Sequence, residues 1–268
     1  MIRLLHFSDP HVQLPRWRER TLRELGPLRS LATVELWKGR GRDYDDAHDK
    51  LAALATHGLA ADHVVCTGDL TQLGHPEEFA LARGALAPLD GRLTCIAGNH
   101  DRYPWDGAPN RFYEESFPGQ AMHASVRVTL AGQGLAFFAL DSAGAVSWPV
   151  LSGGSVSDKA LAQLATELRG HGDRCKLVLV HHAPLRRGGR RDLPWHELHN
   201  ARKLLRVAAE GGAAAVLCGH IHDRFDHPAG PGRARVICAG SSTERGHEGY
   251  WEIAIEGGRI VSADARAI

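Results

Sequence analysis

The chain has 268 residues, of which 43% are hydrophobic and 24% are charged, and its formal net charge is +1. This length suits one large α/β domain or two small ones, and we expect a single domain over 1–268. The near-neutral balance argues against a nucleic-acid-binding protein and against an acidic tail, so any basic patch has to be local.

Short apolar runs that end in polar or glycine-containing residues predict β-strands, in chain order, at 2–7, 63–67, 93–97, 126–130, 135–140, 176–180, 214–218, 235–239 and 250–255. Helical spacing predicts helices at 44–56, 76–86, 157–168 and 197–209. Pro76 suits a first helical turn, and Ser157 suits a helix N-cap. Strands and helices alternate in the first and last thirds, with a hairpin-like pair at 126–140 between them. This order predicts layered sheets flanked by helices.

The cysteines predict a reducing compartment. They are five in number, and most lie in apolar runs: Cys66, Cys95, Cys175, Cys218 and Cys238. We expect reduced thiols in buried strands, and without a C-x-x-C spacing a metal-ligand role is not favoured. The opening segment has no apolar signal-like region, and no 18-residue apolar span follows. We therefore expect a cytoplasmic protein, with peripheral membrane contact left open.

Polar clusters follow the ends of several predicted strands: Asp9-Pro10-His11, Gly68-Asp69, Gly98-Asn99-His100-Asp101, His181-His182 and Gly219-His220-Ile221-His222. Loops at strand ends are where α/β proteins place their sites. Side chains at i and i+2 of an extended segment point to the same side, so each D-x-H or H-x-H pair can enter one cleft. Each cluster alone is weak, because such short patterns arise by chance. Their succession, each after an apolar run, indicates a functional site.

The ordered set resembles the calcineurin-like metallophosphoesterase superfamily, in its bacterial phosphodiesterase branch. The resemblance extends over residues 9–222 and includes the flanks DHVVCTGDLTQLG, LDS at 140–142 and CAGSS at 238–242. Pro10, Ala97 and Ala183 depart mildly from the family pattern, and none of them replaces a ligand. The resemblance implies an α/β fold of the metallophosphoesterase type, a sandwich of two mixed β-sheets flanked by α-helices.

The resemblance also implies two divalent or mixed-valence metal ions, which share Asp69 as a bridging ligand. The residues that would hold the first ion are Asp9, His11, Asp69 and His222, and those for the second are Asp69, Asn99, His181 and His220. Imidazole, carboxylate and amide ligands without thiolate suit Mn, Fe or Zn. Two such ions about 3.5–4 Å apart can activate a bridging hydroxide and clamp a phosphoryl group. The remaining positive charge favours an anionic substrate.

By the same resemblance, His100 protonates the leaving oxygen or stabilises the transition state, and the alternative is a histidine that caps a turn. Asp101 either orients His100 or caps a segment that begins at Tyr103. His182 either contacts substrate or is an exposed structural residue.

Two basic stretches bear on the substrate. Arg186 and Arg187 lie in an arginine-rich loop after His181, and they either grip distal phosphates or are solvated. Residues 15–42 form a basic amphipathic insertion that contains Trp17 and Trp37. It is either an ordinary surface helix packed by its leucines or a lid that meets a lipid, a nucleotide or an anionic membrane.

A phosphodiesterase that acts on a small phosphorylated substrate is the leading functional hypothesis, and both nucleotide and lipid-linked substrates stay open. The basic insertion motivates an alternative, a UDP-2,3-diacylglucosamine pyrophosphatase of lipid A synthesis. A nuclease is less favoured because of the charge balance, and no nucleic-acid partner is expected. A non-catalytic scaffold is disfavoured because every ligand position is filled. The oligomeric state and the metal identity are not predicted.

Overall fold

Two mixed β-sheets form the centre of the computed structural model, which describes residues 1–268 except 22–23, 25–32, 34–35, 105–107, 133 and 145–150. The first sheet has the strand order β11-β10-β1-β2-β3. Its strands are β1 (Ile2–Phe7), β2 (His63–Cys66), β3 (Leu93–Cys95), β10 (Tyr250–Glu256) and β11 (Arg259–Arg266). β1, β2 and β3 run parallel, whereas β10 is antiparallel to β1 and to β11.

The second sheet has the order β4-β5-β6-β7-β9-β8. Its strands are β4 (Arg127–Ala131), β5 (Leu135–Ala139), β6 (Cys175–Leu179), β7 (Ala215–Cys218), β8 (Phe225–His227) and β9 (Val236–Cys238). The four central strands are parallel, and the edge strands β4 and β8 are antiparallel to their neighbours. The sandwich of two mixed sheets and the hairpin of β4 and β5 are thus as predicted.

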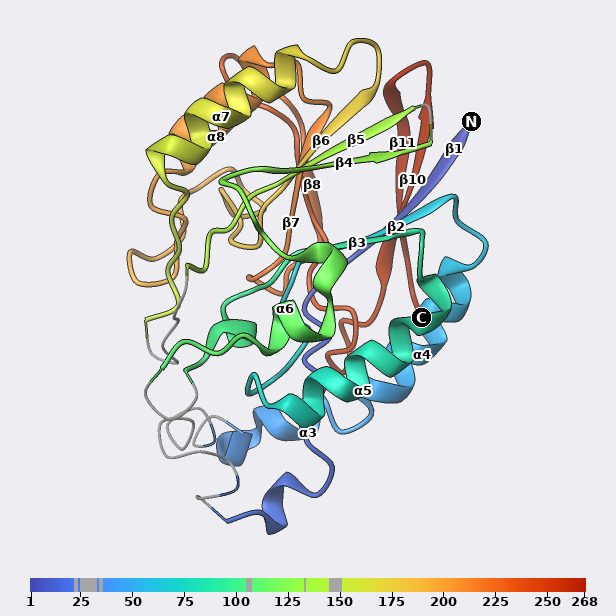
Figure 1. The fold of residues 1–268 in the computed structure, drawn as a ribbon, viewed down its shortest axis with the longest axis vertical. Coiled ribbons are helices and arrows are strands. Elements are labelled where there is room, and N and C mark those ends of the chain that lie inside the picture. The colour runs from blue at the N-terminus through green and yellow to red at the C-terminus, as the bar shows by residue number, and fades with distance from the viewer. Residues whose placement is uncertain (22–23, 25–32, 34–35, 105–107, 133, 145–150) are drawn as a thin grey trace.

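Successive side chains along a strand pack alternately between the two sheets and against the outer helices. Leu4 packs between the two sheets and Leu5 packs under the helices of the first sheet. On β5, Phe137 faces the space between the sheets and Phe138 faces the helices of the second sheet. Because both faces of the central strands are buried, these strands read as continuous apolar runs. The molecule therefore has four layers, with a helical layer outside each sheet (Figure 1).

The helices of the outer layers are α4 (Ala47–Gly58) and α5 (Pro76–Leu86) on the first sheet, and α7 (Asp158–Arg169) and α8 (Ala201–Glu210) on the second. Shorter helical segments are η1 (Trp17–Glu19), η2 (Leu36–Arg40), α3 (Gly41–Asp43), η3 (Ala87–Leu89), η4 (His100–Arg102), α6 (Phe112–Ser116) and η5 (Pro118–Gln120). Pro76 occupies the first turn of α5, and the Ser157 hydroxyl accepts a hydrogen bond from the Ala160 N–H at the start of α7. Both helix starts were predicted.

Some elements differ from the predictions. β8, β11 and α6 were not predicted, although the Gly257-Gly258 pair between two alternating runs is a hairpin signal for β10 and β11. The last long helix begins at Ala201 and not at 197, because the Glu197 carbonyl accepts the Gly154 N–H in an extended pairing.

The insertion at 15–42 is only partly described, and its leucines at 22, 25, 28 and 31 lie outside the described residues. Trp17 is buried with Leu14, Leu36 and Tyr103. Its indole also fits closely against Gly41, where an added Cβ would lie 2.4 Å from the ring. Trp17 is therefore a packing residue and is not available to a membrane, whereas Trp37 is 64% exposed.

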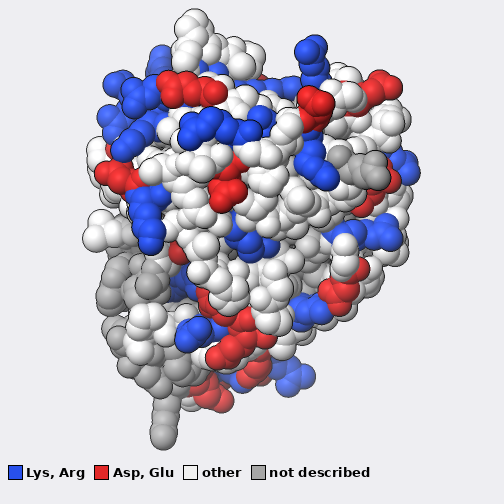
Figure 2. All heavy atoms as spheres, turned by 45° about the horizontal axis from the view of Figure 1, so that its top comes forward, with Lys and Arg blue, Asp and Glu red and all other residues white. Residues whose placement is uncertain are grey.

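Other predictions concern composition. The five cysteines are free and buried, as predicted for thiols in strands and their ends. Positive and negative side chains are interspersed on the face shown in Figure 2, which agrees with the near-neutral net charge. Within the described part of the chain, none of the helices has the length and apolar character needed to cross a membrane.

Candidate metal centre

The residues singled out in the sequence meet where the parallel strands of both sheets end. Asp9 and His11 follow β1, Asp69 follows β2 and Asn99 follows β3, so all the candidate oxygen ligands come from the first sheet. The imidazoles that follow the strands of the second sheet are His181 after β6 and His220 and His222 after β7. The site thus lies across the seam between the sheets, at their carboxyl-terminal edge.

The backbone is left-handed at most of these positions. Within the described residues, positive φ angles outside glycine occur at Arg16 and at five candidate ligands: Asp9 (50°), His11 (44°), Asp69 (52°), His220 (74°) and His222 (52°). Such conformations cost roughly 1–3 kcal/mol each and cluster at functional sites. Backbone hydrogen bonds hold them, among them the Asp9 N–H to the Gly68 carbonyl at 2.9 Å. The strain indicates that these loops are shaped to place side chains.

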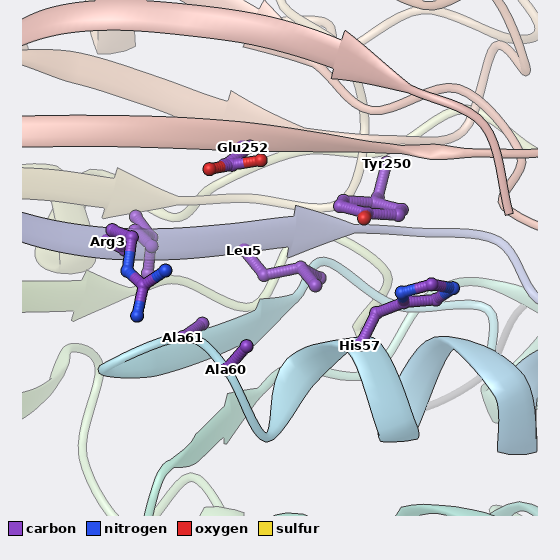
Figure 3. A pocket seen from close by; sticks show the side chains of 8 residues that line it. Arg3, Leu5, His57, Ala60, Ala61, Tyr250 and Glu252 are labelled. Atoms are coloured by element: carbon purple, nitrogen blue, oxygen red, sulfur yellow. The ribbon is translucent and has the colours of Figure 1, made fainter.

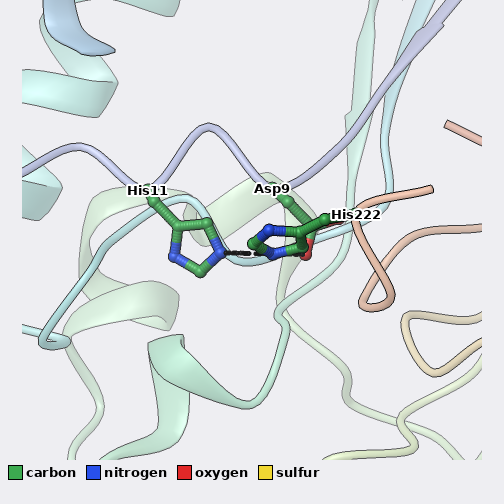
Figure 4. A group of neighbouring side chains, drawn as sticks. All are labelled: Asp9, His11 and His222. Atoms are coloured by element: carbon green, nitrogen blue, oxygen red, sulfur yellow. Dashed lines mark hydrogen bonds and ion pairs between the residues drawn. The ribbon is translucent and has the colours of Figure 1, made fainter. Parts of the chain in front are cut away.

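One group of donor atoms comprises Asp9, His11 and His222, shown in Figure 4. The Nε2 atoms of His11 and His222 are 3.0 Å apart. Oδ1 of Asp9 lies 3.4 Å from Nε2 of His222 and 3.9 Å from Nε2 of His11. The three ligand atoms therefore converge on one point that a single cation could occupy.

A second group comprises Asp69, Asn99, His181 and His220. Oδ2 of Asp69 lies 3.3 Å from Nε2 of His181. The Asn99 amide oxygen is 3.0 Å from Nε2 of His181 and 2.9 Å from Nδ1 of His220. Oδ2 of Asp69 is also 3.7 Å from Nε2 of His11, so this carboxylate lies between the two groups.

Backbone carbonyls determine which ring nitrogens of the second group can bind a metal. The Thr67 carbonyl lies 2.8 Å from Nδ1 of His181, and the His196 carbonyl lies 3.0 Å from Nε2 of His220. A carbonyl accepts only, so each of those nitrogens carries the hydrogen and the other nitrogen of each ring presents its lone pair to the centre. Oxygen and imidazole donors without thiolate fit Mn, Fe or Zn.

The charge of the cluster also fits a cation. Burial raises the pKa of the Asp69 carboxyl, but the imidazoles of His181 and His100 outweigh burial and hold that pKa well below its usual range. Burial lowers the pKa of His181, yet the Asp69 carboxylate raises it to about 10. A carboxylate that stabilises a proton on a fully buried imidazole stabilises other positive charge in the same place.

His100 lies beside this cluster. One of its ring nitrogens is within 4.8 Å of the ligand atoms of His11 and Asp69. Nδ1 lies 2.7 Å from the Gln72 carbonyl, to which it donates, and Nε2 lies 3.2 Å from the Tyr103 hydroxyl. The ring is thus fixed, with Nε2 as the nitrogen that can exchange a proton.

Asp101 lies beside His100 within η4. Its carboxylate accepts hydrogen bonds from the backbone N–H groups of Leu70, Thr71 and Gly98 and from the Thr71 hydroxyl, at 2.8–3.1 Å. These hydrogen bonds go to the loop after β2 and to Gly98, and Asp101 itself lies inside η4. Asp101 joins the loop after β2 to the loop after β3, and so holds two ligand loops together.

His182 also differs from both expectations. Its side chain is buried, Nδ1 lies 2.8 Å from the Ser142 hydroxyl and Nε2 lies 2.8 Å from the Ser152 carbonyl. Burial, reinforced by His181, lowers the pKa of His182 to about 3, so the ring is neutral. His182 supports the centre from behind and is not placed to contact a substrate.

The two predicted arginines have carboxylate partners. Arg187 makes a two-pronged pair with Asp223, the residue after His222, with a shortest distance of 2.6 Å. Arg186 lies 3.4 Å from Asp192 and its side chain is 54% exposed. Neither arginine belongs to the groups of donor atoms that could hold a metal.

Some residues next to the centre were not singled out in the sequence. The His196 ring stacks on His220 with ring centroids 4.0 Å apart. Glu244 and Tyr44 both approach Nδ1 of His222. Glu244 follows the CAGSS flank by two residues, and this position was the only feature of the sequence that could have indicated it. No feature of the sequence indicated His196 or Tyr44.

A cavity of about 150 Å³ lies elsewhere, between β1, β10 and the end of α4 (Figure 3). Leu5, His57, Tyr250 and Glu252 are among its lining residues. None of the candidate metal ligands lines it. This cavity is therefore separate from the candidate metal centre.

Comparison with known proteins agrees with this geometry. The family model described as "Calcineurin-like phosphoesterase" matches residues 2–224. Among curated relatives, the glycerophosphodiester phosphodiesterase GpdQ of Enterobacter lignolyticus is 29% identical over 60% of this chain and 56% of its own length. The 3′,5′-cyclic adenosine monophosphate phosphodiesterase CpdA of Pseudomonas aeruginosa is 30% identical over 63% of this chain and 57% of its own length. The match thus spans little more than half of these relatives.

Solved structures support the fold. A dimetal phosphatase from Danio rerio aligns with a TM-score of 0.63 at 15% identity, over 95% of this chain and 92% of the other. A purple acid phosphatase from yellow lupin aligns with a TM-score of 0.60 at 11% identity, over 96% of this chain and 50% of the other. With the family model covering most of the sequence, the chain belongs to the calcineurin-like phosphoesterase family.

Proposed function

We propose that this protein is a dinuclear metal-dependent phosphodiesterase. The observation that carries the proposal is the convergence of the two donor groups, with Asp69 between them, at the seam of the sheets. Asp9, His11, Asp69 and His222 would hold one ion, and Asp69, Asn99, His181 and His220 would hold the other. Two such ions, when bound, supply charge neutralisation at the phosphoryl group and activation of water.

His100 is the residue that we propose for proton transfer. Its Nδ1–H is held by the Gln72 carbonyl, so a proton carried at Nε2 is available to the oxygen that leaves phosphorus. An alkoxide leaving group needs this proton far more than a phenolate does. The nearness of the His100 ring to the ligand atoms of His11 and Asp69, within 4.8 Å, supports this role.

The relatives favour small phosphodiesters as substrates. GpdQ and CpdA are named for glycerophosphodiesters and for cyclic AMP, and we extend the shared class, a small phosphodiester, to this chain. The lipid-linked pyrophosphate alternative loses one of its supports, because Trp17 is buried, although Trp37 of the same insertion is 64% exposed. The filled ligand set argues against a non-catalytic scaffold.

A substrate panel with the Mn²⁺-loaded protein tests this proposal. Bis-p-nitrophenyl phosphate, cyclic AMP and a glycerophosphodiester are compared with p-nitrophenyl phosphate and a UDP-linked diacyl sugar. We expect the best diester to exceed the monoester at least tenfold in kcat/KM, a difference of about 1.4 kcal/mol in transition-state stabilisation. Chelation should abolish the activity. A preference for the monoester or the pyrophosphate, or turnover by metal-free protein, would contradict the proposal.

A further inference from the structure

Two side chains from distant parts of the sequence meet at Nδ1 of His222. Oε2 of Glu244, in the loop between β9 and β10, lies 2.8 Å from this nitrogen. The Tyr44 hydroxyl, between α3 and α4, lies 2.9 Å from it. The other ring nitrogen, Nε2, faces Asp9 and His11 in the metal centre. The Nδ1 side of His222 is therefore held by Glu244 and Tyr44, and its Nε2 side faces the candidate metal centre.

The two partners differ in what they require of the ring. A tyrosine hydroxyl can donate or accept, so Tyr44 is compatible with either tautomer of His222. An ionised carboxylate only accepts, so Glu244 requires the hydrogen on Nδ1. Nε2 then carries the lone pair, which is the form that binds a metal. Without Glu244, the hydroxyl could donate to Nδ1, and Nε2 would carry a hydrogen toward the centre.

We propose that Glu244 is a positioning residue that fixes the tautomer and orientation of His222 and thereby strengthens binding of the ion held by Asp9, His11 and His222. The inference rests on the proposed metal centre. It does not require Glu244 to touch metal or substrate, because its contact is on the far side of the imidazole ring.

At His181 and His220 the ring nitrogen that faces away from the centre contacts a backbone carbonyl and not a carboxylate. His181 and His220 each donate to a neutral backbone carbonyl, those of Thr67 and His196. A carboxylate partner makes an imidazole a stronger electron donor than a carbonyl does. Glu244 should therefore act on one ion of the pair and leave the other nearly unaffected.

The loop that carries Glu244 is fastened to the first ligand loop. The Ser241 hydroxyl donates to the Asp9 carbonyl at 2.7 Å, and the Thr243 hydroxyl donates to the Pro10 carbonyl at 2.6 Å. Glu244 therefore follows a segment that is hydrogen-bonded to the loop of Asp9, which suits a residue that has to hold a fixed geometry.

Mn²⁺ binding to the full chain, measured without substrate, tests the role of Glu244. Glu244→Leu removes the acceptor and the charge, whereas Glu244→Gln keeps an acceptor and removes the charge. Glu248→Gln is the matched control, because Glu248 lies in the same loop and pairs with Lys50 at 2.8 Å. We expect Glu244→Leu to weaken one of two ions by about 10- to 100-fold, Glu244→Gln to weaken it less, and the control to bind as the wild type does.

A double-mutant cycle shows whether Glu244 acts through His222. In a His222→Ala background, Glu244→Leu should have no further effect on Mn²⁺ affinity. ¹⁵N shifts of the metal-free protein should show His222 protonated at Nδ1 in the wild type and a changed tautomer mixture in Glu244→Leu. If Glu244→Leu does not fold, Glu244→Gln and these shifts decide the question.

Three results would overturn the inference. They are unchanged affinity in both Glu244 variants, an equal loss for both ions, and an additive loss in the His222→Ala background. Wild-type protein that binds no metal would instead contradict the proposed function. The two failures are therefore separable.

Discussion

The two sheets contribute different chemistry to the candidate centre. The first sheet supplies Asp9, Asp69 and Asn99, so all the oxygen ligands and both negative charges come from it. The second sheet supplies only imidazoles, those of His181, His220 and His222, whereas His11 is the one candidate imidazole from the first sheet. Changes at Asp9 or Asp69 therefore alter the charge of the site, whereas changes at the histidines of the second sheet alter its geometry and its electron donation.

The seam between the sheets is closed by apolar packing. Leu4 and Val65 of the first sheet and Phe137 and Leu177 of the second belong to one buried cluster. The strand-end loops of the two sheets are therefore brought together by this hydrophobic core. Variants of the ligands should then lose metal while they keep their fold, and that makes the contrast between the sheets measurable.

Asp69→Asn should have the largest effect, because it removes the one charge placed between both donor groups. We expect both ions to bind weakly and turnover to fall below detection, while the circular dichroism spectrum stays unchanged. Elemental analysis after gel filtration measures the metal. Asp223→Asn is the control, since Asp223 follows a ligand but pairs with Arg187. An Asp69→Asn protein that is active without metal would disprove the metal centre.

His100→Asn should leave two ions bound and reduce kcat by roughly 10²-fold. The reduction should be greater for an alkoxide ester than for a p-nitrophenyl ester, because p-nitrophenolate leaves without a proton. Rates across a series of leaving groups measure this dependence. An equal reduction for both classes would exclude proton transfer by His100 and leave it a role in charge stabilisation.

Asp101→Asn separates a structural role from a catalytic one. The amide keeps one acceptor oxygen and cannot satisfy all the donors now bound by the Asp101 carboxylate. We expect the free energy of unfolding to fall by about 1–3 kcal/mol. Urea denaturation measures it, and the dependence of kcat on the leaving group should match the wild type. If kcat of Asp101→Asn depended differently on the leaving group while its stability matched the wild type, Asp101 would have a catalytic role.

Much of the fold, and the clusters that contain the candidate ligands, could be predicted from local pattern, whereas the assignment of each ligand came from the family resemblance. The ligands Asp9, Asp69 and Asn99 each follow an apolar run, and a strand end is a position that sequence alone can locate. The residues that contact the candidate ligands from behind, such as Tyr44 and Glu244, could not be predicted in this way. Tyr44 and His222 are 178 positions apart and meet only in the folded chain.

Burial was the other property that sequence could not supply. Trp17 among arginines is typical of an exposed amphipathic segment, but it packs against Leu14 and Leu36. His182 beside a ligand suggested a substrate contact, yet both of its nitrogens have partners behind the centre. β11 is largely exposed, so it lacks the apolar run by which the other strands were recognised.

At the amino end of β2, away from the strand-end loops, the seam carries a neutral histidine. His63 stacks on Phe137 across the sheets with centroids 4.9 Å apart, and its Nε2 lies 2.8 Å from the Thr94 hydroxyl. Burial, with a smaller contribution from Arg92, lowers the pKa of His63 to about 4 from 6.5. The unfolded chain therefore takes up the proton first, and stability is lost as the pH falls from about 6.5 toward 4.

His63→Gln should remove part of this acid sensitivity, because glutamine can bond to Thr94 without taking up a proton. With both proteins kept metal-free by chelator, we expect the wild type to lose about 1–3 kcal/mol more than the variant between pH 7 and pH 4.5. Some slope should persist in the variant, since burial also lowers the pKa of His6 to about 3. Urea denaturation at both pH values gives the difference. An identical loss in the two proteins would show that His63 is not a source of the acid sensitivity.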